Sequence, residues 1–426
     1  MSFKPFLICT LCLIFVGENL PAQQQTRRIK QHIVSLSAGS MHGRGYVNKG
    51  VNKAANYISR NFSELGLQPF VDSSYYQHFT FPVNTFPDRL RLQLGRQELQ
   101  AGADYLIDPA STRVDAERLR VKRLKLKSVR DTAQWEAALR KLNPGRAWLL
   151  QDLDTVLKYL KVRRRWVGQQ LPEGLYLVPE ANKLTWSVST DTIAPTIFYI
   201  RKARLPKRVC RVSAVADAKW VKEYGTQNVV GFVPGTEQPD SFIVFTAHYD
   251  HLGRMGRNSI FPGAHDNASG TALMLHLAAY FAANPQPYSI AFMAFSAEEA
   301  GLIGSRYYTE HPLFPLEQIR FLVNLDMTGN ARDGITVVNA TDQKEAFGLL
   351  QKINEEGGFL KAVNERSQAA NSDHYFFSQK GVPAVFIYGL GAKGHYHDIY
   401  DKASELSLEK IDQLALLLID FAKALQ

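Results

Sequence analysis

The sequence predicts an α/β protein: a mostly parallel, mixed central sheet flanked by helices, with a smaller domain inserted into it. Two observations carry this prediction. The second half of the chain alternates apolar runs of strand length with helical stretches, which is typical of a largely parallel sheet covered on both faces. Residues 85–205 lack this alternation, are mixed in pattern and are rich in Lys and Arg, which indicates a separate unit.

Four continuous apolar runs predict strands that are buried on both faces, because no polar residue interrupts them at every second position. They are residues 241–247, 289–295, 320–325 and 384–388. Stretches with helical spacing lie between and after these runs, at residues 269–283, 301–309, 343–355 and 408–425.

The first part of the chain contributes one further helix, predicted over residues 48–65. Val51, Ala55, Ile58 and Phe62 recur at helical spacing, and Gly66 ends the pattern. The alternating residues 90–94 then mark a change of character. We therefore expect a main domain formed by residues 23–84 and 206–426, interrupted by an inserted basic domain at 85–205.

Residues 1–22 have the pattern of a secretory signal peptide. Lys4 gives a basic start, residues 5–16 are apolar, and Ala22 offers a small residue for cleavage. The apolar stretch is short for a membrane span, so an uncleaved anchor is the weaker alternative. The expectation is a secreted or periplasmic protein without stable membrane insertion. Cleavage would leave Cys210 as its one cysteine, and therefore no intrachain disulfide.

The basic charge is concentrated in one part of the chain. Residues 111–170 hold 16 Lys or Arg against 6 Asp or Glu, an excess equal to the net charge of +10 for the whole chain. Such runs invite a nucleic-acid interpretation. No nucleic-acid motif accompanies them and the chain has an export signal, so we expect no nucleic-acid partner and interpret the charge as a solvated basic face.

Acidic and histidine residues follow the predicted strands at the edge where open α/β sheets bind ligands. Each of these residues could instead have an ordinary structural role, as a helix cap, as an acid in the first turn of a helix or as a surface histidine. Their joint occurrence favours a metal site, because carboxylate oxygens and imidazole nitrogens are the ligands that zinc accepts. The candidates are His248, Asp266, Glu298, Glu299, Asp326 and His397, with Asp250 placed to orient the His248 ring.

Six segments carry a resemblance to a known family. GSMHGR, AHYDHLG, GAHDNASG, FSAEEAGLIGS, VNLDMTGN and GHYHDIYD are similar to motifs of the co-catalytic two-zinc aminopeptidases. Relatives in that family include glutamate carboxypeptidases, the transferrin receptor ectodomain and glutaminyl cyclases. The resemblance implies a zinc exopeptidase-like fold, and short fragments of residues 85–205 are reminiscent of a protease-associated domain.

The resemblance also implies a role for each candidate. Asp266 would bridge two Zn²⁺ ions, with His248 and Asp326 on one ion and Glu299 and His397 on the other. Glu298 matches the general base, Tyr396 a residue that stabilises the oxyanion, and Asp250 the partner of the first histidine. His265 departs from the family, which usually has Asp or Asn there.

These residues predict an exported zinc-dependent aminopeptidase that acts on peptide substrates. A carboxypeptidase is an alternative, since Arg254, Arg257 and Lys393 lie in loops where they could bind a substrate carboxylate. A glutaminyl cyclase-like enzyme and a non-catalytic binding protein are the others; the last would be expected to have lost ligands. The sequence leaves the oligomeric state and the side-chain preference open.

Overall fold

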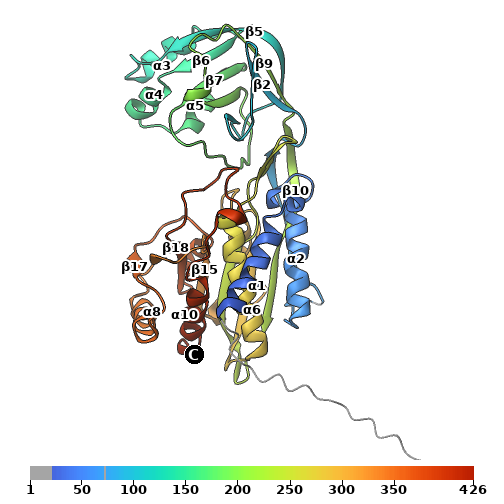
Figure 1. The fold of residues 1–426 in the computed structure, drawn as a ribbon, viewed down its shortest axis with the longest axis vertical. Helices are drawn as coiled ribbons and strands as arrows, with labels where there is room; N and C mark the ends of the chain where they lie inside the picture. The colour runs from blue at the N-terminus through green and yellow to red at the C-terminus, as the bar shows by residue number, and fades with distance from the viewer. Residues whose placement is uncertain (1–21, 72) are drawn as a thin grey trace, which may run out of the picture.

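The computed structural model describes residues 22–71 and 73–426. The predicted signal peptide, residues 1–22, lies outside the described residues except for Ala22, where the first helix begins. The described chain forms two bodies, each built around an eight-stranded sheet (Figure 1). Among these described residues, no helix has the length and apolar character to cross a membrane.

The larger body contains a mixed sheet in which four central strands run parallel to one another and antiparallel pairs lie towards the edges. In spatial order its strands are β1 (Tyr76–Thr85), β10 (Lys219–Val233), β14 (Tyr288–Phe295), β11 (Gln238–His248), β15 (Ile319–Leu325), β18 (Ala384–Leu390), β16 (Gly334–Val338) and β17 (Val363–Arg366). All four strands expected from apolar runs are therefore present, and the expected α/β class with a mixed sheet is confirmed.

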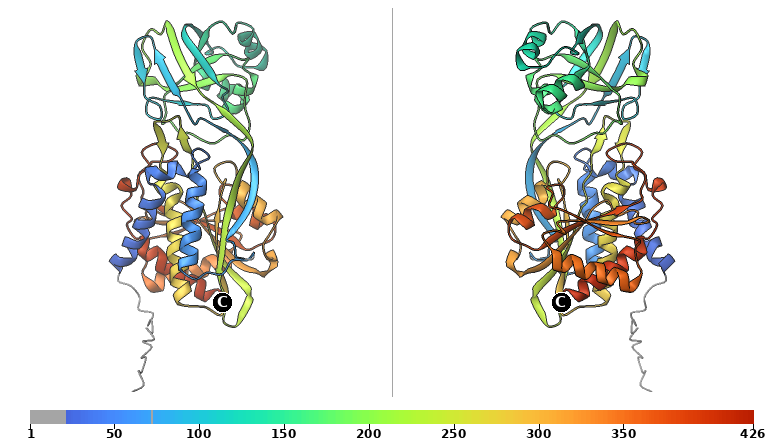
Figure 2. Two further views of the ribbon diagram at one scale, coloured as in Figure 1. Left: turned by 90° about the vertical axis from the view of Figure 1, so that its right-hand side faces the viewer. Right: turned by 90° about the vertical axis from the view of Figure 1, so that its left-hand side faces the viewer.

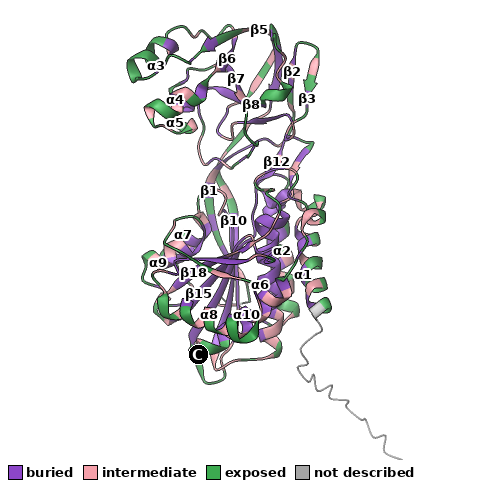
Figure 3. Ribbon diagram, turned by 60° about the vertical axis from the view of Figure 1, so that its left-hand side comes forward, coloured by how far each residue is buried: buried purple, intermediate pink, exposed green. Residues whose placement is uncertain are grey.

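The apolar runs are explained by burial on both faces of this sheet. Along β11, Ile243 and Phe245 belong to one hydrophobic core, whereas Phe242 and Val244 belong to the core on the opposite face. Since side chains alternate between the two faces of a strand, a strand covered on both sides must be apolar at every position. Figure 3 shows the central strands as the most continuously buried part of the larger body.

Helices cover both faces. α2 and α6 pack on one face, with α1 lying over α6 and α10 beside it, while α7 and α9 pack on the other (Figure 2). Their bounds are α1 (Ala22–Leu36), α2 (Gly50–Glu64), α6 (Ser269–Ala283), α7 (Ile303–Glu310), α8 (Lys344–Gly357), α9 (His374–Gln379) and α10 (Ile411–Ala424). The five helices expected from periodicity are confirmed, with ends that differ from the expected ones by at most three residues.

The second sheet lies at the other end of the molecule (Figure 1). Its spatial order is β3 (Gln97–Leu99), β2 (Leu90–Leu94), β9 (Arg211–Ala216), β5 (Val114–Lys125), β6 (Ala147–Gln151), β7 (Leu175–Glu180), β8 (Thr196–Arg201) and β4 (Tyr105–Ile107). Three helices accompany it: α3 (Thr132–Leu139), α4 (Leu153–Leu160) and α5 (Arg164–Gln170). Trp135, Val156 and Val167 place these helices in the core of this second body.

The second sheet extends beyond residue 205, where the sequence suggested a boundary. β9 (Arg211–Ala216) pairs with both β2 and β5, so residues 211–216 belong to the second sheet. The chain then returns to the larger body along β10. The mixed pattern of this region gave no sign of β9, because the strand is defined by partners far away in sequence.

The two bodies share packing at their junction. A two-stranded ribbon, β12 (Gly253–Met255) and β13 (Ser259–Phe261), projects from the larger body. Its Met255 and Phe261 are buried in the core of the second body, where the Phe261 ring stacks on Trp186 at 4.9 Å between centroids. This contact brings the second body beside the loops that follow the parallel strands.

Candidate metal centre

The candidate ligands converge at the carboxyl edge of the parallel strands. Four of them end a strand, follow a strand directly or lie in the loop after it, and one lies in a helical turn just before α6. His248 ends β11, Glu299 follows β14, Asp326 follows β15, His397 lies in the loop after β18, and Asp266 lies in the turn Ala264–Ala268. The structure thus brings together all five ligands expected from the sequence.

Asp266 lies between two histidines and faces each with a different carboxylate oxygen. Its Oδ1 is 3.4 Å from Nε2 of His248, and its Oδ2 is 3.1 Å from Nε2 of His397. The carboxylate is buried, and the peptide bond that follows it is cis. Although burial alone would raise the pKa of Asp266, the two histidines hold it well below its usual range.

Asp326 presents one free oxygen to the same site. Its Oδ1 lies 3.4 Å from Nε2 of His248 and is buried without a hydrogen-bond partner among the described residues. Its Oδ2 accepts a hydrogen bond from the hydroxyl of Ser372 at 2.9 Å, and Asn324 donates to that hydroxyl at 2.8 Å. The side chain is therefore held from one side while the other oxygen stays available for a cation.

Glu299, like Asp326, has one carboxylate oxygen held by a neighbouring side chain and the other facing the site. Its Oε1 lies 2.6 Å from Nδ1 of His251, and its Oε2 lies 3.1 Å from Nε2 of His397. Burial opposes ionisation, yet His397 and His251 lower the pKa of Glu299 to about 2. An ionised Glu299 requires a proton on Nδ1 of His251, so this histidine orients the carboxylate by donating to it.

Asp250 connects the first strand end to the Glu298–Glu299 segment. Its carboxylate accepts hydrogen bonds from the hydroxyl of Tyr46 at 2.7 Å and from the backbone amides of Glu298 and Glu299 at 3.1 and 3.3 Å. Nδ1 of His248 lies closer to the Asp250 backbone carbonyl, at 3.3 Å, than to its carboxylate, at 3.8 Å. Asp250 thus fixes the position of two acidic residues as well as neighbouring His248.

The backbone around Asp266 is fixed by two further charged residues. Asp401 accepts hydrogen bonds from the amides of His265 and Asp266 at 2.8 and 3.1 Å. Arg44 is fully buried and donates to five backbone carbonyls, those of Leu36, Tyr249, Pro262, Gly263 and Asp266. Burial lowers the pKa of Arg44 to about 10, and Asp401 and Asp266 oppose this effect.

Glu298 has a different environment from Glu299. Its Oε2 lies 3.9 Å from Nε2 of His248, at the rim of the ligand cluster. Burial raises the pKa of Glu298 well above its usual range, and Glu299 and Asp326 add to this effect while His248 opposes it. A carboxylate with a raised pKa beside a cation site is suited to accept a proton and return it.

Tyr396 lies at the entrance of the site. It is 44% exposed, and its ring stacks on that of His397 at 3.9 Å between centroids. Partial burial of the phenol raises the pKa of Tyr396, and the carboxylates of Asp266 and Glu299 add to the effect, so the hydroxyl keeps its proton and can donate.

The spacing of the donor atoms fits zinc. Tetrahedral zinc with bonds of about 2.0–2.2 Å places its ligand atoms about 3.3–3.6 Å apart. The distances from His248 to Asp266 and Asp326, and from His397 to Asp266 and Glu299, are 3.1–3.4 Å. Two groups of three potential ligands cluster separately, His248 with Glu298 and Asp326, and His251 with Asp266 and Glu299. They differ from the sets expected from the sequence by having Glu298 in place of Asp266 in the first and His251 in place of His397 in the second. The donor arrangement is therefore compatible with two cations.

Three residues of this site were not singled out from the sequence: His251, Asp401 and, as a positioning residue, Arg44. His251 stands within the segment AHYDHLG, and Asp401 follows GHYHDIY, so both lie close to expected ligands. A histidine or carboxylate three or four residues from a ligand is a weak signal by itself. Only the folded loops turn these side chains towards Glu299 and the Asp266 backbone.

Other residues noted from the sequence have defined surroundings. His265 is buried, which lowers its pKa, and its Nδ1 has no partner among the described residues. Arg257 pairs with Asp88 at 3.1 Å and Lys393 with Glu405 at 2.7 Å. Arg254 contacts Nδ1 of His42 at 2.9 Å.

Comparison of the sequence with known proteins finds aminopeptidases among its relatives. The chain is 31% identical to aminopeptidase YwaD of Bacillus subtilis (strain 168) over 241 residues, which covers 54% of the chain and 51% of that relative. It is 26% identical to leucine aminopeptidase 1 of Ajellomyces capsulatus (strain H88) over 221 residues, 46% of the chain and 55% of the relative. The chain thus spans about half the length of these curated relatives.

Solved structures share the fold over nearly the whole chain. The zinc aminopeptidase BSAP from Bacillus subtilis superposes with a TM-score of 0.68 at 20% identity and covers 96% of each chain. A peptidase M28 precursor from Shewanella amazonensis SB2B gives 0.65 at 16% identity and covers 95% of this chain and 97% of its own. The model of the family described as "Peptidase family M28" matches residues 228–422, and this range contains every candidate ligand. The resemblance inferred from the motifs is therefore confirmed, and residues 228–422 match the model of peptidase family M28.

Proposed function

We propose that this protein is a zinc-dependent aminopeptidase that removes N-terminal residues from peptides. The observation that carries the proposal is the placement of Asp266, whose two carboxylate oxygens face His248 and His397 separately. A carboxylate in this position can bridge two cations. The name of the relative with 31% identity, an aminopeptidase, supports the same activity.

Two Zn²⁺ ions per chain would be held by the residues expected from the sequence. His248 and Asp326 would hold one ion, Glu299 and His397 the other, and Asp266 both. Zinc supplies two kinds of chemistry in such a site: it lowers the pKa of water and polarises a carbonyl group. The orphaned Oδ1 of Asp326 supports this assignment, because a buried carboxylate oxygen is costly without a cation or donor.

Glu298 is the proposed general base. Its carboxylate would take a proton from the attacking water and transfer it to the amine that leaves. The hydrogen bonds from the amides of Glu298 and Glu299 to Asp250 keep this segment in place during the transfer. Glu298 and Asp326 would also attract the positively charged α-amine of the substrate, which is the feature that selects an N-terminus.

Tyr396 is the proposed donor to the oxyanion. Its hydroxyl keeps its proton at neutral pH, and the stacking on His397 restricts the position of the ring.

The proposal has three further parts. The protein is exported, its substrates are peptides, and the chain divides into a peptidase domain and an inserted basic domain.

The carboxypeptidase alternative has less support. It needs a cation that is free to bind the substrate carboxylate. Arg257 and Lys393 pair with acidic residues at the surface, and Arg254 contacts His42. None of these contacts is with the candidate ligands.

The test is hydrolysis of a panel of aminoacyl-anilides and their N-acetylated counterparts by the purified protein. Each substrate is assayed with zinc, after treatment with a chelator and after zinc is restored. We expect cleavage of the free-amine substrates alone, its loss with the chelator and its recovery with zinc.

Two other results would contradict the proposal in different ways. Cleavage of the acetylated substrates at a similar rate would exclude a requirement for the free amine. No cleavage of any substrate by protein that holds two zinc ions would remove the aminopeptidase assignment and leave the cyclase and binding-protein alternatives to be tested.

A further inference from the structure

The loop that carries Tyr396 and His397 is held by a segment of the second body. This loop, residues 391–402, follows β18 and contains neither strand nor helix. A short 3₁₀ turn begins directly after it, at Ala403. The segment that contacts it, residues 182–189, joins β7 and β8 of the second sheet and is likewise irregular. We refer to these two stretches as the ligand loop and the 182–189 segment.

Trp186 and His397 form a reciprocal pair of hydrogen bonds. The Trp186 amide donates to the His397 carbonyl at 3.0 Å, and Nδ1 of His397 lies 2.9 Å from the Trp186 carbonyl. Because a carbonyl oxygen only accepts, Nδ1 must carry a proton. A proton on Nδ1 leaves Nε2 as the nitrogen that can bind a cation, and it is Nε2 that faces Asp266 and Glu299 at 3.1 Å.

Lys183 holds the loop on both sides of His397. Its ammonium donates to the carbonyls of Gly394 and Tyr396 at 2.6 and 3.0 Å and pairs with Asp398 at 2.7 Å. The Asp398 side chain is only 6% exposed, so the ion pair draws a buried carboxylate of the ligand loop towards the second body. Three contacts from one ammonium thus fix the residues immediately before and after His397.

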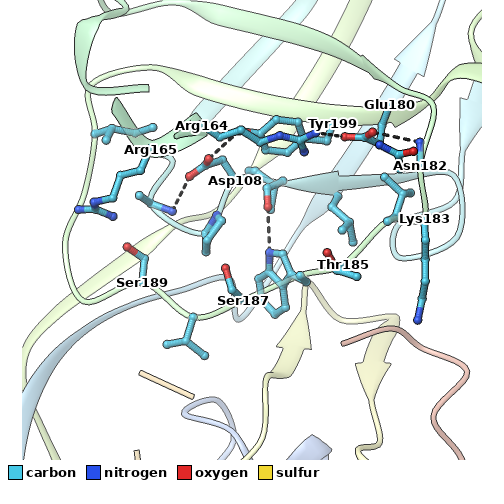
Figure 4. Close-up of a pocket in the computed structure, with 18 residues that line it drawn as sticks. Asp108, Arg164, Arg165, Glu180, Asn182, Lys183, Thr185, Ser187, Ser189 and Tyr199 are labelled. Carbon is cyan, nitrogen blue, oxygen red and sulfur yellow. Dashed lines mark hydrogen bonds and ion pairs between the residues drawn. The ribbon is translucent and has the colours of Figure 1, made fainter. Parts of the chain in front are cut away.

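The 182–189 segment is itself anchored in the second body. The Trp186 indole donates to the Ile107 carbonyl at 2.9 Å, and its ring stacks on Phe261. The segment also lines a pocket of about 640 Å³ together with charged residues such as Arg164 and Glu180. Figure 4 shows Lys183 extending away from these charged residues, on the side of the segment opposite to them.

We propose that the 182–189 segment positions a metal ligand: Lys183 and the Trp186 backbone hold His397 in the orientation and tautomer that binds a cation through Nε2. The second body therefore controls the affinity of one of the two metal positions. A residue that hydrogen-bonds the second nitrogen of a ligating histidine has this effect in metal sites generally. The inference rests on the proposed metal centre and adds to it a contribution from the second body.

The experiment measures zinc affinity in the full chain by competition with a chromogenic chelator. In Lys183→Met we expect one of two zinc ions to bind about 10-fold to 100-fold more weakly, the range for residues that support a metal ligand. Lys183→Arg, which retains the charge, should recover part of the loss. His397→Ala identifies the affected position, because it should weaken the same ion.

The matched control is Lys125→Met, which removes an exposed lysine of β5 in the same second sheet and should bind zinc like the unmodified protein. Thermal unfolding in excess chelator shows whether each variant is folded without metal. Should Lys183→Met not fold, Trp186→Phe supplies the second test, because it removes the indole anchor while keeping an aromatic ring, and it should weaken the same ion.

The outcomes separate this inference from the proposed function. Two zinc ions bound by folded Lys183→Met with unmodified affinities would overturn the positioning role while leaving the peptidase proposal intact. An unmodified protein that binds no zinc, or binds it without cleaving peptides, would instead contradict the proposed function. At saturating zinc, Lys183→Met should regain most of its activity, because the variant retains every catalytic group.

Discussion

Nδ1 of His251 lies 2.6 Å from Oε1 of Glu299, and this contact leaves Oε2 of Glu299 facing His397. Asp326 follows the same rule, since Ser372 holds one of its oxygens while the other faces His248. Each acid that would serve a single cation therefore has one oxygen held and one free. Asp266, which would serve both, offers both of its oxygens to the site.

His251→Phe should weaken zinc binding at the position formed by Glu299 and His397 by about 10-fold to 100-fold, because an aromatic ring is kept while the orienting donor is lost. Competition with a chromogenic chelator measures the change. His78→Phe, at an exposed position on β1, is the matched control and should leave both affinities unchanged. Equal affinities in His251→Phe and the unmodified protein would show that Glu299 needs no partner.

Glu298→Gln should retain two zinc ions and lose about 10²-fold to 10⁴-fold in kcat/KM, because the amide keeps the shape of the side chain but cannot accept the proton. Zinc content is measured on the same samples as hydrolysis of an aminoacyl-anilide. A variant with normal metal content and near-normal turnover would remove Glu298 from the role of general base.

Arg44→Met should lower the free energy of unfolding by about 3–5 kcal/mol, because it leaves several buried backbone carbonyls without a donor. Urea titration in excess chelator measures this loss apart from metal binding. The control is Arg306→Met, since this exposed arginine of α7 forms a surface ion pair with Glu310 one turn away, and about 0.5 kcal/mol is expected. A similar small change in Arg44→Met would contradict its structural role.

His276 should make stability fall in mild acid. It lies on α6 under α1, and burial, together with nearby His32 and Arg28, lowers its pKa to about 4. The unfolded chain, with an ordinary histidine pKa of about 6.5, binds the proton more readily, so the contribution is complete above pH 6.5 and declines as the pH falls towards 4. The expected loss at pH 5 is about 2 kcal/mol.

Urea unfolding at pH 7.5 and pH 5 in metal-free protein measures this loss. His276→Leu should reduce the difference between the two pH values by that amount, whereas His78→Leu, at an exposed position, should leave it unchanged. An identical pH dependence in His276→Leu and the unmodified protein would show that another group is responsible.

Most strands and helices of the larger body could be predicted from the sequence, because their hydrophobic patterns depend on residues that are close together in the chain. Residues 242–245 are all apolar since β11 is covered on both faces, and the spacing of Val51, Ile58 and Phe62 follows from one buried face of α2. The second body was less predictable. β9 is a strand because β2 and β5 lie beside it, and that pairing depends on residues about 90–120 positions earlier in the chain.

The sequence by itself determined the α/β class, the strands of the central sheet and the five candidate ligands. Four of these ligands end or follow a strand, and Asp266 precedes a helix, and these elements are specified by their own neighbouring residues. Tertiary structure alone decided what holds those ligands. His251, Arg44, Asp401 and the 182–189 segment reach the site through irregular loops, whose paths depend on long-range packing and carry no periodic signal. The orientation of Glu299 and the tautomer of His397 therefore become visible only in the folded chain.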